Sequence, residues 1–152
     1  MSDSLEFKWT PPDLPRRMAA YPREMDKEAE KAGQDALGVL HETVPAYPPP
    51  PPGSKYVRTE RLGRSLGSGF GGGKMGFPDV YEFKRLGAGQ YEGTFGSRLS
   101  YAKWVVGTKT QAGVHQGRWY VMADILDKAK GKIVEPFVAA GKRMVAFLGG
   151  RG

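Results

Sequence analysis

The stretch "DVYEFKRLGAGQYEGTFGSR", residues 79–98, alternates apolar and polar side chains on both sides of a short Gly-Ala-Gly segment. Alternation with a period of two is typical of β-strands, and a short glycine turn between two such runs indicates an antiparallel pair. We expect Tyr81 and Phe83 on one face of the first strand and Val80 and Glu82 on the other. The middle of the chain is therefore predicted to form a small antiparallel sheet.

A helix is predicted before the strands, at residues 22–43. Apolar side chains recur there at steps of three or four, which places them on one stripe of an α-helix. Pro22 suits a first helical turn, and Pro45 prevents continuation. The alanine-rich stripe allows another backbone to approach closely, either that of the chain's own sheet or that of a neighbouring subunit, and both alternatives stay open. The stripe consists of Met18, Tyr21, Met25, Ala29, Ala32, Ala36 and Val39.

The last element is also predicted to be helical, within residues 120–148. Its apolar side chains follow helical spacing, with Pro136 expected in the first turn and Gly149-Gly150 ending the helix. They are Ile133, Phe137, Ala140, Met144, Phe147 and Leu148.

These elements predict an α+β fold in a single domain covering residues 1–152, the size of one ordinary domain. Its order is an N-terminal helix, an extended polyproline arm, a small antiparallel β-sheet and a C-terminal helix. The segments are an N-terminal extension at 1–21, the helix at 22–43, the arm at 44–57, a turn and β region at 58–119 with a flexible glycine loop at 67–76, and the helical region at 120–148.

The arm contains five consecutive prolines, Pro48, Pro49, Pro50, Pro51 and Pro52. Such a run favours polyproline II, a stiff rod with no internal hydrogen bonds. The preceding "PAYP" also fits the PxxP pattern of docking peptides, although that pattern is common in proline-rich sequence. We expect a strut that reaches toward a neighbouring subunit.

Arginine recurs every third residue in the turn after the arm, at Arg58, Arg61 and Arg64, which would place the three guanidinium groups on one side of a helical turn. The hydroxyl of Thr59 can cap that turn. The following "GSGFGGGKMG" satisfies GxGxxG formally, but no strand precedes it and no helix follows it. A dinucleotide site is therefore not expected there.

Composition excludes several classes of protein. The chain has no cysteine, which rules out disulfides, thiolate zinc sites and cysteine nucleophiles. No apolar run approaches the roughly 18 residues of a membrane span, and the first residues do not resemble a signal peptide. We expect no membrane partner and synthesis in the cytoplasm.

The positive charge is concentrated in the last third of the chain, where residues 103–152 hold nine Lys or Arg against three Asp or Glu. Such an excess suits nucleic acid, an acidic protein partner or a solvated surface. The only histidines, His41 and His115, form no metal-ligand or catalytic spacing. We expect no enzyme, no metal and no cofactor.

Two motifs give the chain a resemblance to a known family. The segment "YPPPPPGSKYVRTERLGRSL" between a helix and a strand pair, followed by "YAKWVVGTKTQAGVHQGRWY" and a terminal helix, resembles the tail-completion or minor tail (neck) proteins of long-tailed bacteriophages and prophages. The matching residues are Arg58, Thr59, Leu62, Ser65, Tyr101, Ala102, Val105 and Gly107, with "GRW" at 117–119. Glu60 stands where that family usually has glycine.

The resemblance implies a structural virion protein that forms a homo-oligomeric ring at the head–tail junction around the DNA path. Its partners would be copies of itself and neighbouring connector, tail terminator or tail tube proteins, with DNA passing through the lumen without sequence-specific contact. The alternatives are a basic nucleic-acid-binding module and a proline-rich docking adaptor. The expected interface residues are Pro48, Pro49, Pro50, Pro51, Pro52, Tyr56, Arg58, Thr59, Arg61, Leu62, Ser65, Tyr101, Trp104 and Trp119.

Overall fold

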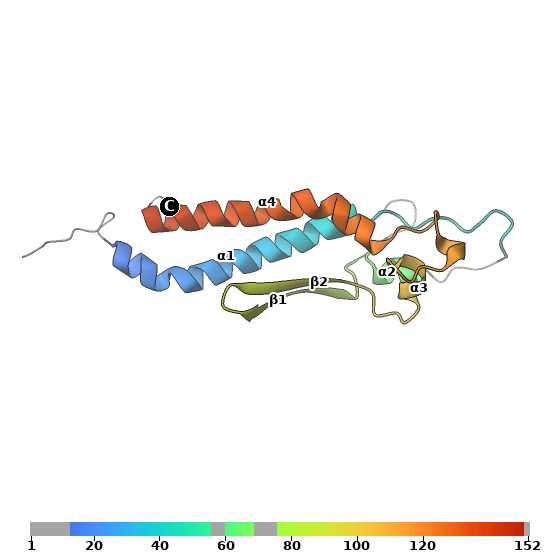
Figure 1. The fold of residues 1–152 in the computed structure, drawn as a ribbon, viewed down its shortest axis with the longest axis horizontal. Coiled ribbons are helices and arrows are strands. Elements are labelled where there is room, and N and C mark those ends of the chain that lie inside the picture. The colour runs from blue at the N-terminus through green and yellow to red at the C-terminus, as the bar shows by residue number, and fades with distance from the viewer. Residues whose placement is uncertain (1–12, 56–59, 69–75, 151–152) are drawn as a thin grey trace, which may run out of the picture.

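The computed structural model describes residues 13–55, 60–68 and 76–150, and within them it shows an α+β fold (Figure 1). Two long helices, α1 (Leu14–Thr43) and α4 (Met122–Gly149), run side by side in opposite directions. A two-stranded antiparallel sheet, β1 (Val80–Gly87) and β2 (Gln90–Gly96), lies along α1. The short helices α2 (Arg61–Ser65) and α3 (Ala102–Val106) and the 3₁₀ turn η2 (Gly113–His115) gather at one end.

The predicted antiparallel hairpin is confirmed, with its turn between Gly87 and Gln90. Tyr81 pairs with Phe95 and Phe83 with Gly93, so the aromatic side chains of the two strands share one face of the sheet. This face turns toward α1, where Gly33 is buried directly against the ring of Phe83. The helix therefore packs on the chain's own sheet through Gly33, which is not one of the residues of the alanine stripe.

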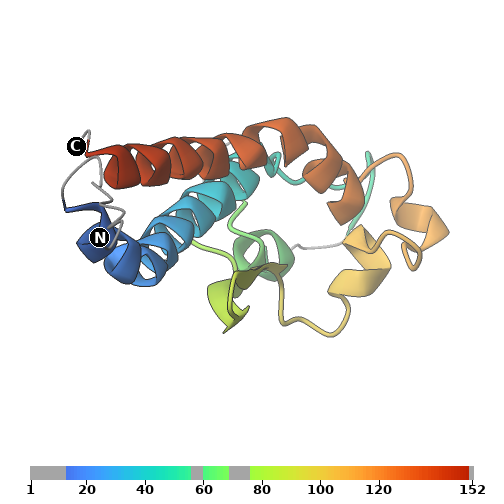
Figure 2. The same cartoon turned by 60° about the vertical axis from the view of Figure 1, so that its left-hand side comes forward.

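The other side of α1 packs on α4, and small side chains let the two helices approach closely. Ala32 and Ala36 of α1 and Ala129 and Ala140 of α4 are buried. Polar contacts join the same helices, because Arg143 forms an ion pair with Glu28 at 2.6 Å. Figure 2 shows that the first turns of α1 and the last turns of α4 lie at the same end of the molecule.

Both long helices begin earlier in the sequence than the positions of Pro22 and Pro136 suggested. The predicted helix 22–43 begins at Leu14 instead, with Pro15 in its first turn and Pro22 inside it, and the helix bends in its first third (Figure 1). Likewise α4 begins at Met122 and continues through Pro136. A proline removes one hydrogen bond from a helix, and packing along thirty residues compensates for that local loss.

The straight polyproline arm is not confirmed. Residues 44–55 contain neither helix nor strand, and the amide of Ser54 donates to the carbonyl of Pro51 at 3.0 Å, which closes a turn at the end of the proline run. Gly53 makes this reversal possible because it adopts φ +75°, which a side chain disfavours. The run therefore ends in a bend. The glycine loop 67–76 is described only at Gly67, Ser68 and Gly76.

Candidate binding pocket at the α2–α3 end

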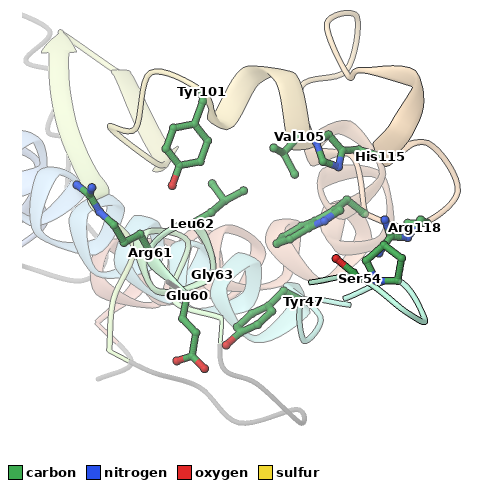
Figure 3. Close-up of a pocket in the computed structure, with 12 residues that line it drawn as sticks. Tyr47, Ser54, Glu60, Arg61, Leu62, Gly63, Tyr101, Val105, His115 and Arg118 are labelled. Carbon is green, nitrogen blue, oxygen red and sulfur yellow. The ribbon is translucent and has the colours of Figure 1, made fainter. Parts of the chain in front are cut away.

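A pocket of about 400 Å³ lies at the end of the molecule formed by α2, α3, η2 and residues 44–55 (Figure 3). Three segments that are far apart in the sequence supply its walls. The proline segment contributes Tyr47, Pro51 and Ser54, the α2 turn contributes Glu60, Arg61, Leu62 and Gly63, and the segment from α3 to the start of α4 contributes Tyr101, Val105, His115, Arg118 and Trp119.

An apolar cluster supports the pocket from below. Leu62 and Val105 line the pocket and are almost completely buried, and they belong to a cluster with Leu66, Ala102 and Val106. Buried branched side chains of this kind are rigid and hold the surrounding backbone in place. The pocket therefore has a firm apolar floor.

The ring of Tyr47 forms one wall and fixes the start of the proline segment on its own subunit. Tyr47 is only 4% exposed, and its ring stacks on that of Trp119, with centroids 6.1 Å apart and planes 10° apart. The ring also covers Gly63, where a Cβ atom would overlap it. Glycine at this position therefore provides the space for the aromatic wall.

Hydrogen bonds hold the same segment in place on both sides of Tyr47. Ser68 Oγ donates to the carbonyl of Pro45 at 2.6 Å, and Arg118 Nη2 donates to the carbonyl of Pro49 at 3.2 Å. These carbonyls can accept such bonds because residues 44–55 form neither helix nor strand that would supply backbone partners. The first half of the predicted arm is thus attached to its own subunit, and residues 49–55 are exposed.

Gln111 holds together the loop that carries Trp119. Its Nε2 donates to the carbonyls of Val105 at 2.7 Å and of Trp119 at 3.1 Å, so one amide side chain joins the end of α3 to the start of α4. The loop also closes on itself, because the amide of Ala112 donates to the carbonyl of Trp104 at 2.8 Å. These bonds keep the indole of Trp119 against Tyr47.

The charged groups around the pocket are mostly positive. Arg61 and Arg118 line it, and no acidic side chain in the parts of the chain that the structure describes forms an ion pair with either of them. The carboxylate of Glu60 is paired with Arg64 at 3.3 Å. A ligand with apolar side chains and at least one carboxylate would complement this arrangement.

Glu60 has a left-handed backbone, with φ 58° and ψ 5°, immediately before α2. Residues with side chains rarely adopt this conformation, whereas glycine adopts it without strain. The resembled family usually has glycine at this position. Glu60 therefore retains the turn that glycine would favour, at a cost in local strain.

The pocket brings together five of the expected interface residues, Pro51, Arg61, Leu62, Tyr101 and Trp119. Ser65, the last residue of α2, is buried outside the pocket, and its Oγ donates to the carbonyl of Leu62 at 2.8 Å. Trp104 is half exposed outside the pocket, with the ammonium of Lys103 5.0 Å from its ring centre. Pro48, Pro49, Pro50 and Pro52 do not line the pocket either, and Tyr56, Arg58 and Thr59 lie outside the described residues.

Sequence reasoning missed Tyr47 and did not select Val105, His115 or Arg118 as interface residues. Tyr47 stands next to the proline run and has the aromatic character of a wall residue, but its position against Trp119 depends on contacts across 72 residues. Arg118 lies within the "GRW" motif, and this motif was the one sequence feature that could have marked Arg118 as an interface residue. Its bond to Pro49 could not be inferred from spacing.

Burial raises the pKa of Tyr120 to about 12, since a phenolate would lose hydration beside Trp119 and the core of this end. Tyr120 is therefore protonated at neutral pH.

Among residues 13–55, 60–68 and 76–150, no cluster of three or more His, Asp or Glu side chains could hold a metal ion, and no helix is long and apolar enough to cross a membrane. No protein-family model, curated protein or solved structure matches the chain.

Proposed function

We propose that the protein is a structural virion component of a tailed phage, a tail-completion or neck protein that forms a ring at the head–tail junction around the DNA path. The observation that carries this proposal is the convergence of the resembling motifs on one pocket. Arg61 and Leu62 come from the first motif, Tyr101 and Val105 from the second, and Trp119 from "GRW". Residues that belong to one interface are expected to meet in space in this way.

Exposed apolar side chains also favour an assembly role. Leu126, Val134, Val138 and Val145 of α4 are each at least half exposed, and Phe77 and Val114 are exposed by more than two thirds. Val134, Val138 and Val145 recur at steps of four and seven, which places them on one face of α4, and contiguous exposed apolar patches commonly mark contacts with other proteins. In the proposed ring, these side chains contact neighbouring subunits or the connector, tail terminator and tail tube proteins.

Deletion of the gene in the phage or prophage that encodes the chain tests this proposal. Heads filled with DNA and separate tails should accumulate, and supplying the intact chain in trans should restore joined particles that contain it in a ring seen by electron microscopy. Joined, infectious particles in the absence of the chain would contradict the proposal.

A nucleic-acid-binding module differs from a ring component in its response to salt. A protein that mainly binds phosphates loses affinity steeply as salt rises, because bound counterions are released. We expect only weak, sequence-independent binding of short DNA duplexes. Tight binding that persists at physiological salt would favour the alternative.

A further inference from the structure

We propose that the pocket at the α2–α3 end binds residues 5–9, "LEFKW", of a neighbouring copy of the same chain. This inference rests on the proposed function, because it names the partner that would link the subunits of the ring. It follows from the chemistry of the pocket, from the length of chain that carries the segment, and from the position of the pocket along the molecule.

The segment has side chains that complement the pocket. In an extended peptide, Leu5, Phe7 and Trp9 lie on one side and Glu6 and Lys8 on the other, because successive side chains alternate. The apolar side would meet the floor and the aromatic walls, where aromatic rings stack favourably. The carboxylate of Glu6 would meet Arg61, which lies at one edge of the pocket, opposite Arg118 (Figure 3), and forms no ion pair with an acidic side chain among the described residues.

The size of the pocket suits this ligand. Its volume of about 400 Å³ accommodates one or two large side chains, while a folded domain could not enter it. An aromatic side chain in a desolvated pocket surrounded by a charged rim is the usual form of a strong anchor at a protein interface. Phe7 and Trp9 are the candidates for that anchor.

The segment cannot reach the pocket of its own subunit. Leu5 lies eight positions before Asp13, and a fully extended chain of eight steps spans at most about 29 Å. Helix α1, with its 30 residues, is about 45 Å long. The pocket lies beyond the far end of α1, at the opposite end of the molecule from Asp13 (Figures 1 and 3). The occupant must therefore come from another copy.

The resulting contact is head-to-tail. One subunit offers the segment before α1 and its neighbour offers the pocket, so the two contacting surfaces differ. Repetition of such a contact produces a closed ring when the rotation between subunits is a whole fraction of a turn. This geometry provides a ring without requiring the proline run to reach a neighbour.

Cysteine crosslinking tests the inference directly, since the natural chain has no cysteine to interfere. Chains carrying Lys8→Cys are mixed with chains carrying Ser54→Cys under mild oxidation, which places one thiol beside the anchors and the other at the pocket rim. We expect a mixed disulfide dimer, and a ladder of larger species from a chain that carries both substitutions. The matched control pairs Lys8→Cys with Lys128→Cys, an exposed position on α4, and should give only background crosslinking.

A charge reversal sharpens the test. Glu6→Lys or Arg61→Glu alone should reduce the mixed dimer about fivefold, and the two together should restore it in part. The inference is contradicted if the Ser54→Cys and Lys128→Cys partners crosslink equally, or if the doubly substituted chain forms only an internal disulfide. If crosslinking contradicts the contact but the chain is still needed to join heads and tails, the proposed function is supported and only this contact is wrong. If the mixed dimer forms but joined particles assemble without the chain, the contact is supported and the proposed function is wrong.

Discussion

The two ends of the molecule use the same local contact, an aromatic ring over a buried glycine, for different purposes. In the helix–hairpin region, formed by α1, α4, β1 and β2, the ring of Phe83 lies on Gly33 and also approaches Phe137 of α4. At the α2–α3 end, the ring of Tyr47 lies on Gly63 and stacks on Trp119 at the pocket. The first contact joins three elements, whereas the second leaves one side of the aromatic pair facing a cavity.

This difference between the two aromatic–glycine contacts indicates that the helix–hairpin region mainly stabilises the fold, whereas the α2–α3 end mainly serves binding. Phe83 is partly buried between α1, β2 and α4, and these regular elements leave its ring little room to shift. Tyr47 belongs to an irregular segment held by a few hydrogen bonds, and it can move at a smaller energetic cost. Substitutions in the first region should change folding, and those in the second should mainly change assembly.

The largest expected effect concerns alkaline pH at the α2–α3 end. The folded-state pKa of Tyr120 is raised by burial to about 12, above its ordinary value of 10, so its contribution to stability is complete below pH 10 and is lost between about pH 10 and 12. The resulting loss in the free energy of unfolding should approach about 3 kcal/mol only above pH 12. Urea unfolding followed by circular dichroism at several alkaline pH values would measure it.

The Tyr120→Phe variant provides the control for this prediction. Without an ionisable phenol, the variant should lose clearly less of its free energy of unfolding than the parent over the same pH range. An equal loss in the variant would mean that other groups cause the alkaline effect. A loss of near-UV signal without loss of helix would mean that the α2–α3 end unfolds separately from the helices.

The next effect concerns the glycine of the helix–hairpin region. In Gly33→Ala, the added methyl group overlaps the ring of Phe83, and the free energy of unfolding should fall by about 1–3 kcal/mol. Gly131→Ala is the matched control, because Gly131 is also helical but faces open space, and alanine there should stabilise the protein by about 0.5–1 kcal/mol. Equal and favourable effects at both positions would show that Phe83 does not pack closely on α1.

A smaller effect on stability is expected for Gly63→Ala at the pocket. The methyl group overlaps the ring of Tyr47, which can shift away, so we expect a cost of about 1 kcal/mol in the free energy of unfolding. Formation of the mixed disulfide dimer should fall much more than this cost implies. A variant that crosslinks as well as the parent would show that the Tyr47 wall is not needed for binding.

The smallest effect concerns the strained turn before α2. Glycine relieves the left-handed backbone of residue 60, whereas alanine keeps the strain, and both remove the exposed pair with Arg64. Glu60→Gly should therefore be about 1 kcal/mol more stable than Glu60→Ala. Thermal unfolding of the two variants side by side measures this difference, and equal stability would argue against a left-handed backbone there.

Local periodicity was sufficient to predict the two strands and the two long helices, but not the path of the proline segment. Alternation predicted the two strands, and steps of three and four predicted both long helices, because these patterns reflect one-sided burial directly. The starts of the helices were placed too late because Pro22 and Pro136 were interpreted as first-turn residues. In both cases long-range packing outweighs the local penalty of a proline.

The site was only partly predictable for a related reason. Arg61, Leu62, Tyr101 and Trp119 were selected from motifs and do line one pocket. The role of Tyr47 and the return of the proline segment onto Arg118 depend on contacts between distant segments, which spacing does not encode. A run of prolines predicts a stiff segment, but it does not predict what that segment packs against.

Hydrogen–deuterium exchange, compared between the free chain and the assembled ring, tests most directly whether the α2–α3 end is the surface that joins the subunits. We predict that assembly slows exchange in residues 60–68, 101–119 and the segment before α1, while the buried centres of α1 and the hairpin exchange as in the free chain. Unchanged exchange around the pocket, with new protection confined to the exposed face of α4, would contradict this account.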